Sequence, residues 1–308
     1  MQTVVAYERA LNNFKPLRRI LCYDDFDNGA NGWMDLRPNF VRENFAPHVS
    51  AMDHLSWGPP MLSTGTFRFA GTHGSMNGLY SMKLATRAHA DRYEKPPAPG
   101  SMSHLIKRLS RPDDISKLQF EMWYTYTAEQ DRPGIGETAV RAFGMYFDVQ
   151  DAQYRYFPGV RYVNSINGEM AQFWQYMKTV NVSNEEWAYG LEGDWCVTGI
   201  DPHWYGERFP DGSAVGFDPV PGGKQELIYN ETDCKYNWLY FRLLIDLKAR
   251  KYIEFQSGDQ TFDLSRYGPT LVAPYERIHN LINPIIFIEA DTDRRVFLYV
   301  DSAVTSVE

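Results

Sequence analysis

Hydrophobic and polar residues alternate with a period of two in many short runs along the chain. Successive side chains of a β-strand point to opposite faces, so this alternation predicts half-buried strands. The clearest runs span residues 66–70, 79–86, 118–127, 141–150, 160–165, 170–178, 238–247, 251–256, 260–264, 285–290 and 295–302. Long helical periodicity is almost absent after residue 21. The pattern therefore predicts at least ten strands with no helices between them.

Turn residues separate the runs at spacings typical of hairpins. Ile166-Asn167-Gly168 joins two of them, and Asn-Gly is the strongest short hairpin signal. Gly258-Asp259 and Asp291-Thr292-Asp293 are further turns of the same kind. Strands joined by hairpins form antiparallel sheets, and such sheets bury their apolar faces by stacking. We expect an all-β protein: a two-layer antiparallel β-sandwich of the jelly-roll kind with long loops.

The chain shows no linker that would divide this sandwich. We predict an N-terminal helical extension over residues 1–21, in which a short helix-compatible run ends at Lys15-Pro16 and packs across the outside of the body. Residues 22–308 then form a single β-sandwich domain. Residues 37–62, 87–117 and 183–236 lack a period, so they are expected as long loops, the last as an irregular insertion.

Charge and cysteine content exclude several classes of function. With 39 acidic and 31 basic residues the net charge is -8, which is poorly suited to nucleic acid or an anionic membrane surface. Three cysteines without CxxC spacing argue against a disulfide framework or a zinc site. The first residues carry no secretory signal, and no run is long enough to span a membrane, so a cytoplasmic location is expected. Homo-oligomerisation stays open.

Aromatic residues make up 15% of the chain, which favours β structure and surfaces that stack on flat ligands. Sorting each strand by its period of two gives a face opposite the hydrophobic side. That face carries Glu121, Trp123, Tyr146, Asp148, Gln172, Trp174, Tyr176, Tyr240, Arg242 and Glu254. Rings beside hydrogen-bonding groups suit a sugar, whose C–H face stacks and whose hydroxyls need partners. The alternative is ordinary packing of these aromatics under the 183–236 insertion.

Two catalytic mechanisms fit residues of this face. A glycosidase needs two carboxylates, for which Glu121, Asp148 and Glu254 are the candidates. A lyase would use Tyr146 or another Tyr or His as base, with arginine and glutamine binding a sugar carboxylate. The loop sequence His203-Trp204-Tyr205 adds a candidate catalytic histidine and a substrate-binding Trp204. The remaining substrate-binding candidates are Trp123, Gln172, Trp174, Tyr176, Tyr240 and Arg242.

Three segments of the chain resemble a known group of folds. The segment Tyr23–Trp33 (YDDFDNGANGW) looks like the opening strand and turn of carbohydrate-active jelly rolls, and Gly78–Leu84 (GLYSMKL) looks like one of their inner strands. Phe297–Ser302 (FLYVDS) is similar to their closing strand. The similarity is to the concanavalin A-like and galactose-binding-like sandwiches, which include lectins, glucanases and polysaccharide lyases. The resemblance implies a carbohydrate ligand and carries over no catalytic residue.

Such folds often hold a structural Ca²⁺ between the first and last strands. The resemblance places Asp25 and Asp301 as its carboxylate ligands, with backbone carbonyls near Gly78 completing the set. The alternative is that these aspartates cap turns, a common role for aspartate. No cofactor is expected for catalysis.

The sequence therefore leaves three classes of function. The first is a carbohydrate-active enzyme, a glycoside hydrolase or lyase, which the length of the chain and its loops favour slightly. The second is a non-catalytic carbohydrate-binding protein on the same fold. The third is a structural or assembly subunit that binds a partner protein through an exposed apolar patch.

Overall fold

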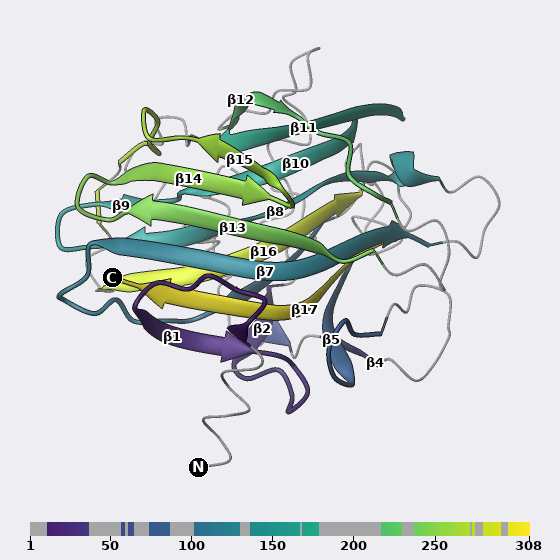
Figure 1. The fold of residues 1–308 in the computed structure, drawn as a ribbon, viewed down its shortest axis with the longest axis horizontal. Helices are drawn as coiled ribbons and strands as arrows, with labels where there is room; N and C mark the ends of the chain where they lie inside the picture. Colours follow the sequence, from purple (N-terminus) through teal and green to yellow (C-terminus); the bar gives the residue numbers. More distant parts are fainter. Residues whose placement is uncertain are drawn as a thin grey trace, which may run out of the picture.

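The computed structural model describes residues 11–36, 57–58, 61–64, 74–86, 102–129, 136–166, 168–178, 217–229, 237–271, 273–274, 280–290 and 295–308. Two β-sheets, here called sheet A and sheet B, contain all seventeen strands of these residues. They are stacked one behind the other in Figure 1, with sheet A in front. Every strand pairing in the described ranges is antiparallel, so the expected two-layer β-sandwich is confirmed.

Sheet A has eight strands in the order β15-β14-β13-β7-β17-β5-β4, with β1 also paired to β17. Their bounds are β1 (Arg19–Asp24), β4 (Met61–Thr64), β5 (Tyr80–Ala85), β7 (Lys117–Ala128), β13 (Leu239–Asp246), β14 (Lys251–Ser257), β15 (Gln260–Asp263) and β17 (Val296–Val307). Strands near both ends of the chain thus lie side by side in this sheet, at the lower left of Figure 1.

Sheet B has nine strands in the order β12-β11-β10-β8-β16-β6-β2-β3, with β9 paired to β8. Their bounds are β2 (Trp33–Leu36), β3 (Trp57–Gly58), β6 (Met102–Lys107), β8 (Val140–Gln150), β9 (Arg155–Tyr156), β10 (Gly159–Ile166), β11 (Glu169–Met177), β12 (Phe217–Lys224) and β16 (Leu281–Ala290). A short 3-10 helix, η3 (Glu137–Ala139), precedes β8. No helix in the described ranges is long and apolar enough to cross a membrane.

The hydrophobic core lies between the sheets, where the alternation in the sequence predicts it. Phe120 of β7 contacts both Phe147 of β8 and Phe241 of β13, with ring centroids 6.1 and 6.4 Å apart. These three rings join sheet A to sheet B. Inward-facing residues of the two central strands are fully buried, among them Leu118, Met122, Tyr124, Phe143, Met145 and Val149. Burial of apolar surface of this kind is the main stabilising contribution to a sandwich.

Some strands were not predicted, and two predicted elements lie outside the described residues. β6 falls within the expected loop 87–117, and β12 falls within the expected insertion 183–236. β12 has no readable period because its sequence, FDPVPGGK, mixes proline and glycine with apolar residues. β1 begins at Arg19, inside the expected N-terminal extension. The expected strand 66–70, and most of the expected helix before Lys15, lie outside the described residues.

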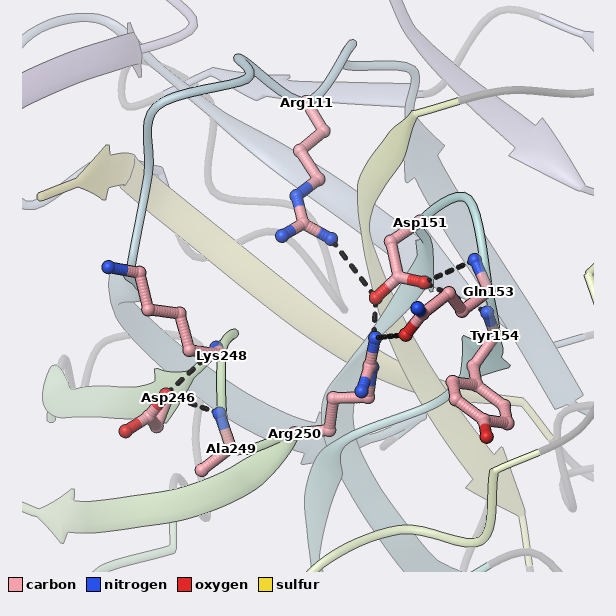
Figure 2. Close-up of polar contacts among 8 residues, drawn as sticks. All are labelled: Arg111, Asp151, Gln153, Tyr154, Asp246, Lys248, Ala249 and Arg250. Atoms are coloured by element: carbon pink, nitrogen blue, oxygen red, sulfur yellow. Dashed lines mark hydrogen bonds and ion pairs between the residues drawn. The ribbon is translucent and has the colours of Figure 1, made fainter.

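One end of the sandwich is held by a carboxylate between two arginines (Figure 2). Asp151, in the turn after β8, accepts a hydrogen bond of 2.9 Å from Nε of Arg250, which lies in the β13–β14 turn of the other sheet. The same oxygen lies 3.4 Å from Nη1 of Arg111. Partial burial raises the pKa of Asp151, but hydrogen bonds from Arg250 and from the N–H groups of Gln153 and Tyr154 outweigh it and lower the pKa.

A second ion pair holds the N-terminal turn. Nζ of Lys107, at the end of β6, lies 2.6 Å from Oδ2 of the buried Asp24, at the end of β1. Trp33 Nε1 donates to the same oxygen at 2.9 Å, and Lys107 also donates to the carbonyl of Asn31. One buried carboxylate therefore joins sheet A, sheet B and the turn between β1 and β2.

Lys83 of β5 is a partly buried lysine on the outer face of sheet A, and its burial changes its pKa. Its Nζ lies 4.3 Å from the ring centroid of Phe297 and 5.7 Å from that of Tyr299. Burial, with help from the nearby Arg295, lowers the pKa of Lys83 from 10.5 to about 8. The unfolded chain thus binds more protons than the folded chain between these pH values, and stability rises with pH across that window.

We expect Lys83→Met to be more stable than the wild type below pH 8, where the wild type must bury a charge. The advantage should shrink as pH rises toward 10 because the wild-type amine becomes neutral. Urea unfolding of both proteins at pH 7, 8.5 and 10 measures the difference. A difference that stays constant over this range would contradict the lowered pKa.

Candidate functional site

The residues that the sequence placed on a single face are divided among the outer face of sheet A, the outer face of sheet B and the interior between the sheets. Glu121, Trp123, Tyr240, Arg242 and Glu254 lie on the outer face of sheet A. The outer face of sheet B carries Tyr146 and Asp148, whose neighbours in β8 point into the core. His203 and Trp204 lie outside the described residues.

Trp174 and Tyr176 of β11 point between the sheets, contrary to the sequence prediction. Trp174 is fully buried, its ring centroid lies 4.5 Å from that of Phe255, and its Nε1 donates to Gln225. Tyr176 packs against the ring of Tyr267. The prediction took the aromatic side of this strand for the ligand side, but burial of large rings between the sheets orients the strand the other way. Gln172 has a positive φ of 55° and breaks the alternation at this point.

Residues 11–18, here called the N-terminal strap, lie across the outer face of sheet A. Glu121 is fully buried beneath them and accepts hydrogen bonds from Tyr240 Oη (2.5 Å), Gln119 Nε2 (2.9 Å) and the main-chain N–H of Lys15 (2.6 Å). Burial, together with the Glu121 carboxylate, raises the pKa of Tyr240. The strap therefore covers this face at Glu121.

The third acid of the sequence prediction, Glu254, forms an ion pair with Arg242 on the same face. Both side chains are partly exposed, and the pair lies beside the strap-covered area. Glu254 is opposite Leu244 of β13, and Glu121 is opposite Arg242, two residues away in the same strand. The two acids therefore lie two strands apart, on either side of β13. Strand and residue spacings put the two Cα atoms roughly 12 Å apart. Arg242 engages Glu254, so these acids do not form a free pair of carboxylates.

The outer face of sheet B carries a row of side chains from five neighbouring strands. In the strand register, His104 of β6 is opposite Phe287 of β16, which is opposite Gly144 of β8. Gly144 is opposite Arg161 of β10, and Arg161 is opposite Gln175 of β11. Each of these positions alternates with residues of the inter-sheet core, so the row faces away from the core.

Arg161 is the centre of this row. Its Nε donates to Gln175 Oε1 at 2.8 Å, its Nη1 lies 3.4 Å from Glu289 Oε1, and its guanidinium lies 3.8 Å from the ring centroid of Phe217. Arg141 pairs with the other oxygen of Glu289. Burial lowers the pKa of Arg161 from 12.5 to about 10, so the residue stays charged at neutral pH.

Gly144 allows the strands at this point to approach each other. A Cβ atom at Gly144 would lie 2.2 Å from the carbonyl oxygen of Val160 and 2.7 Å from Cα of Arg161. Both are main-chain atoms, so a side chain at this position would displace β10 and with it the Arg161 guanidinium. The glycine is therefore part of what positions the row.

His104 is buried on this face without a hydrogen-bond partner. Neither ring nitrogen has one among the described residues, and the ring packs against Tyr146 and Phe287 at centroid distances of 6.3 and 5.8 Å. Burial lowers the pKa of His104 from 6.5 to about 3. Nε2 of Gln175 is likewise buried without a partner. Buried polar groups are normally hydrogen-bonded, so these nitrogens stand out as unused hydrogen-bonding groups on this face.

The two carboxylates on this face are both held in ion pairs. Asp148 accepts two hydrogen bonds of 2.8 Å from Arg155, in the two-pronged geometry that arginine favours with carboxylates. Glu289 is held by Arg141 and Arg161. Asp148 is opposite Asn283, which is six residues from Glu289 along β16, so the two acids lie about 20 Å apart. That separation exceeds the span of a glycosidase pair.

The structure places Asp25 in the turn after β1 and Asp301 in β17, the two residues that the resemblance implied as Ca²⁺ ligands. Oδ1 of Asp301 accepts hydrogen bonds from Ser75 Oγ and from the main-chain N–H groups of Met76 and Asn77. Asp25 accepts the N–H of Asp27. Oδ2 of Asp301 is buried without a hydrogen-bond partner among the described residues, and no group of three or more His, Cys, Asp or Glu side chains that could hold a metal ion occurs among them. The hydrogen bonds to Asp25 and to Oδ1 of Asp301 are of the turn-capping kind, and the Ca²⁺ site stays a prediction.

Sequence reasoning missed His104, Arg161, Gln175 and Glu289. His104 lies in β6, which the sequence did not mark as a strand, and Glu289 was taken only as part of a hydrophobic run. Arg161 and Gln175 alternate with core residues in their strands, so the period of two carried the signal. For Gln175 the period of two was not enough, because the sequence did not show that Trp174 and Tyr176, and not Gln175, face the core.

The chain belongs to the family described as a domain of unknown function, DUF6772, whose model matches residues 1–308. No curated protein matches the chain. Similar solved structures include a legume lectin-like domain from Entamoeba histolytica (7% identity, 80% of this chain and 88% of that chain, TM-score 0.35). Lectin I-B4 from Griffonia simplicifolia covers 90% and 99% at 8% identity and TM-score 0.35. An alginate lyase mutant in complex with alginate tetrasaccharide covers 73% and 80% at 9% identity and TM-score 0.36. At these values the similarity carries no argument about ligand or reaction.

Proposed function

We propose that this member of the DUF6772 family binds a saccharide on the outer face of sheet B. The observation that carries the proposal is the set of unpartnered, buried polar atoms on that face: both ring nitrogens of His104 and Nε2 of Gln175. Leaving such atoms without partners costs about 1–3 kcal/mol each. A sugar hydroxyl is donor and acceptor at once, so it can pair with either kind of nitrogen.

The surroundings of these atoms also suit a sugar. The rings of Tyr146 and Phe287 lie next to His104 and offer apolar surface to a sugar C–H face. The charged Arg161 adds hydrogen-bond donors in the middle of the row. These side chains are at most 2% exposed, so binding requires the face to become accessible to the ligand.

Binding is better supported than hydrolysis. A retaining or inverting glycosidase needs two carboxyl groups about 5–10 Å apart. Asp148 and Glu289 are about 20 Å apart by strand spacing, and arginines hold both of them. The two acids are therefore too far apart to act together on one glycosidic bond.

A lyase reaction is the second candidate, because His104 and Tyr146 are neighbours and could act as base and acid. The burial that isolates His104 weighs against it. A pKa of about 3 makes its neutral form stable at pH 7 but also a weak base, whereas an efficient general base has a pKa near the working pH. The lyase candidate predicts an unsaturated uronate product that absorbs in the ultraviolet. Binding without this product supports the binding function.

An array of neutral and acidic oligosaccharides, followed by calorimetric titration, tests the proposal. We expect Gln175→Leu, which keeps the side-chain volume, to weaken binding of the selected saccharide by at least roughly tenfold. Arg242→Gln, on the outer face of the other sheet, is the matched control and should bind like the wild type. Equal weakening by both variants, or no saccharide bound by the folded wild type, would count against this site.

A further inference from the structure

Lys83 of β5 carries an amine that no acidic side chain holds. Its Nζ lies over the rings of Phe297 and Tyr299 and, among the described residues, makes no hydrogen bond and no ion pair. The side chain is partly exposed, so a small molecule in solution can reach it. The strap packs on β7 and on the last residues of β17, whereas Lys83 is opposite Tyr299 near the start of that strand. The strap and Lys83 therefore lie on different parts of the face.

The acid whose charge acts on Lys83 is held by another cation. Glu129, directly after β7, forms an ion pair with Arg295, and its main-chain N–H donates to the carbonyl of Arg295 at 3.1 Å. Burial raises the pKa of the Tyr299 phenol, so that group stays neutral beside Lys83. The titratable side chains of the described residues around Lys83 are thus a paired acid, its arginine and a neutral phenol.

These surroundings favour the neutral, nucleophilic form of the amine. Burial and the charge of Arg295 lower the pKa of Lys83 to about 8, and Glu129 acts in the opposite direction without outweighing them. Loss of water and the presence of a second cation are the two ways in which proteins activate a lysine as a nucleophile. At pH 7 roughly one Lys83 amine in ten is then neutral, against about one in two thousand for an ordinary lysine.

We propose that Lys83 is a covalent attachment site for a small 2-oxo acid, which carries a carbonyl group next to a carboxylate. The amine attacks the carbonyl carbon, and the carbonyl oxygen takes up the proton that the amine loses. Loss of one water molecule from this adduct breaks the C–O bond and leaves an imine between Lys83 and the ligand. The step needs no oxidant and no reductant.

Arg295 provides a partner for the carboxylate of the ligand. Its side chain is 48% exposed, and it donates to Glu129 through Nη2. A guanidinium has five N–H donors, so others stay available for a second carboxylate. The site is on sheet A and does not depend on the proposed saccharide function, which concerns the opposite sheet.

Reductive trapping on the full-length protein tests the site. The protein is incubated with glyoxylate, the simplest 2-oxo acid, and cyanoborohydride, which reduces the imine and leaves a carboxymethyl group on the lysine. Peptide mass spectrometry then gives the rate of labelling at each lysine. At pH 7 we expect Lys83 to be labelled at least roughly tenfold faster than Lys117, whose ammonium group forms an exposed ion pair with Glu308. The rate at Lys83 should level off above about pH 8, and Lys83→Arg should abolish the fast labelling.

A second arm tests the carboxylate. Propanal offers an aldehyde without a carboxylate, so the ratio of the glyoxylate rate to the propanal rate at Lys83 reports the contact with Arg295. Arg295→Gln should lower this ratio at least roughly threefold, whereas the exposed control Arg266→Gln should leave it unchanged. Labelling of Lys83 no faster than that of Lys117 in the folded protein would overturn the covalent site. Fast labelling with a ratio that Arg295→Gln does not change would overturn the 2-oxo acid as its ligand.

Discussion

Lys107→Met is expected to lower the free energy of unfolding by about 3–5 kcal/mol, because it leaves the Asp24 carboxylate buried without its cation. Trp33 Nε1 remains as a donor to Asp24, but a neutral indole does not replace the ammonium group 2.6 Å away. The loss should appear as a lower midpoint in urea unfolding at pH 7, with an unchanged dependence on urea concentration.

Two further variants separate the buried charge from other effects of this substitution. The double variant Asp24→Asn with Lys107→Met removes both charges, so it should recover most of the lost stability. Lys117→Met removes the lysine of a solvent-exposed pair with Glu308 and should cost less than about 1 kcal/mol. Similar losses for Lys107→Met and Lys117→Met would contradict the account of the N-terminal turn.

His104→Phe is expected to make the protein more resistant to acid. The wild-type imidazole has a pKa of about 3 in the folded chain and an ordinary value of 6.5. The unfolded chain therefore binds the extra proton between these values, and stability is lost as pH falls from 6.5 toward 3. A shift of this size corresponds to a loss on the order of 5 kcal/mol once pH is below both values.

Phenylalanine has no group to protonate, so this contribution to acid sensitivity disappears in the variant. At pH 7 the variant should be as stable as the wild type or more stable, because the replaced ring nitrogens have no partners to lose. Urea unfolding of both proteins from pH 7 to pH 4 measures the difference between them. A parallel loss of stability in the two proteins would show that His104 does not contribute to it.

The alternation of apolar residues was sufficient to predict the sandwich and the central strands. β7, β8, β13 and β14 are close to their predicted bounds because each has an unbroken run of core residues on one side. β12 was not predicted, since its prolines and glycines hide the period although Phe217 and Val220 are buried. Local pattern thus suffices where one face of a strand is continuously apolar.

The candidate site was less predictable because a period of two does not tell which sheet a strand joins. Glu121 and Asp148 each alternate with core residues along their own strand, yet they are on the outer faces of different sheets. The pairing of β8 with β16 and of β7 with β17 decides this, and both pairings join segments far apart in the sequence. The row from His104 to Gln175 depends on four pairings, two of which join β16 to distant segments, so it could not be assembled from local sequence.

Calorimetric titration of wild type and His104→Phe with the saccharide selected from the array tests whether the unpartnered imidazole belongs to a saccharide site. We expect the wild type to bind, and the variant, though at least as stable at pH 7, to bind at least roughly tenfold more weakly. Such a result would tie the unpartnered imidazole to the ligand and separate binding from folding. Equal affinity of the two proteins would contradict a saccharide site on the outer face of sheet B.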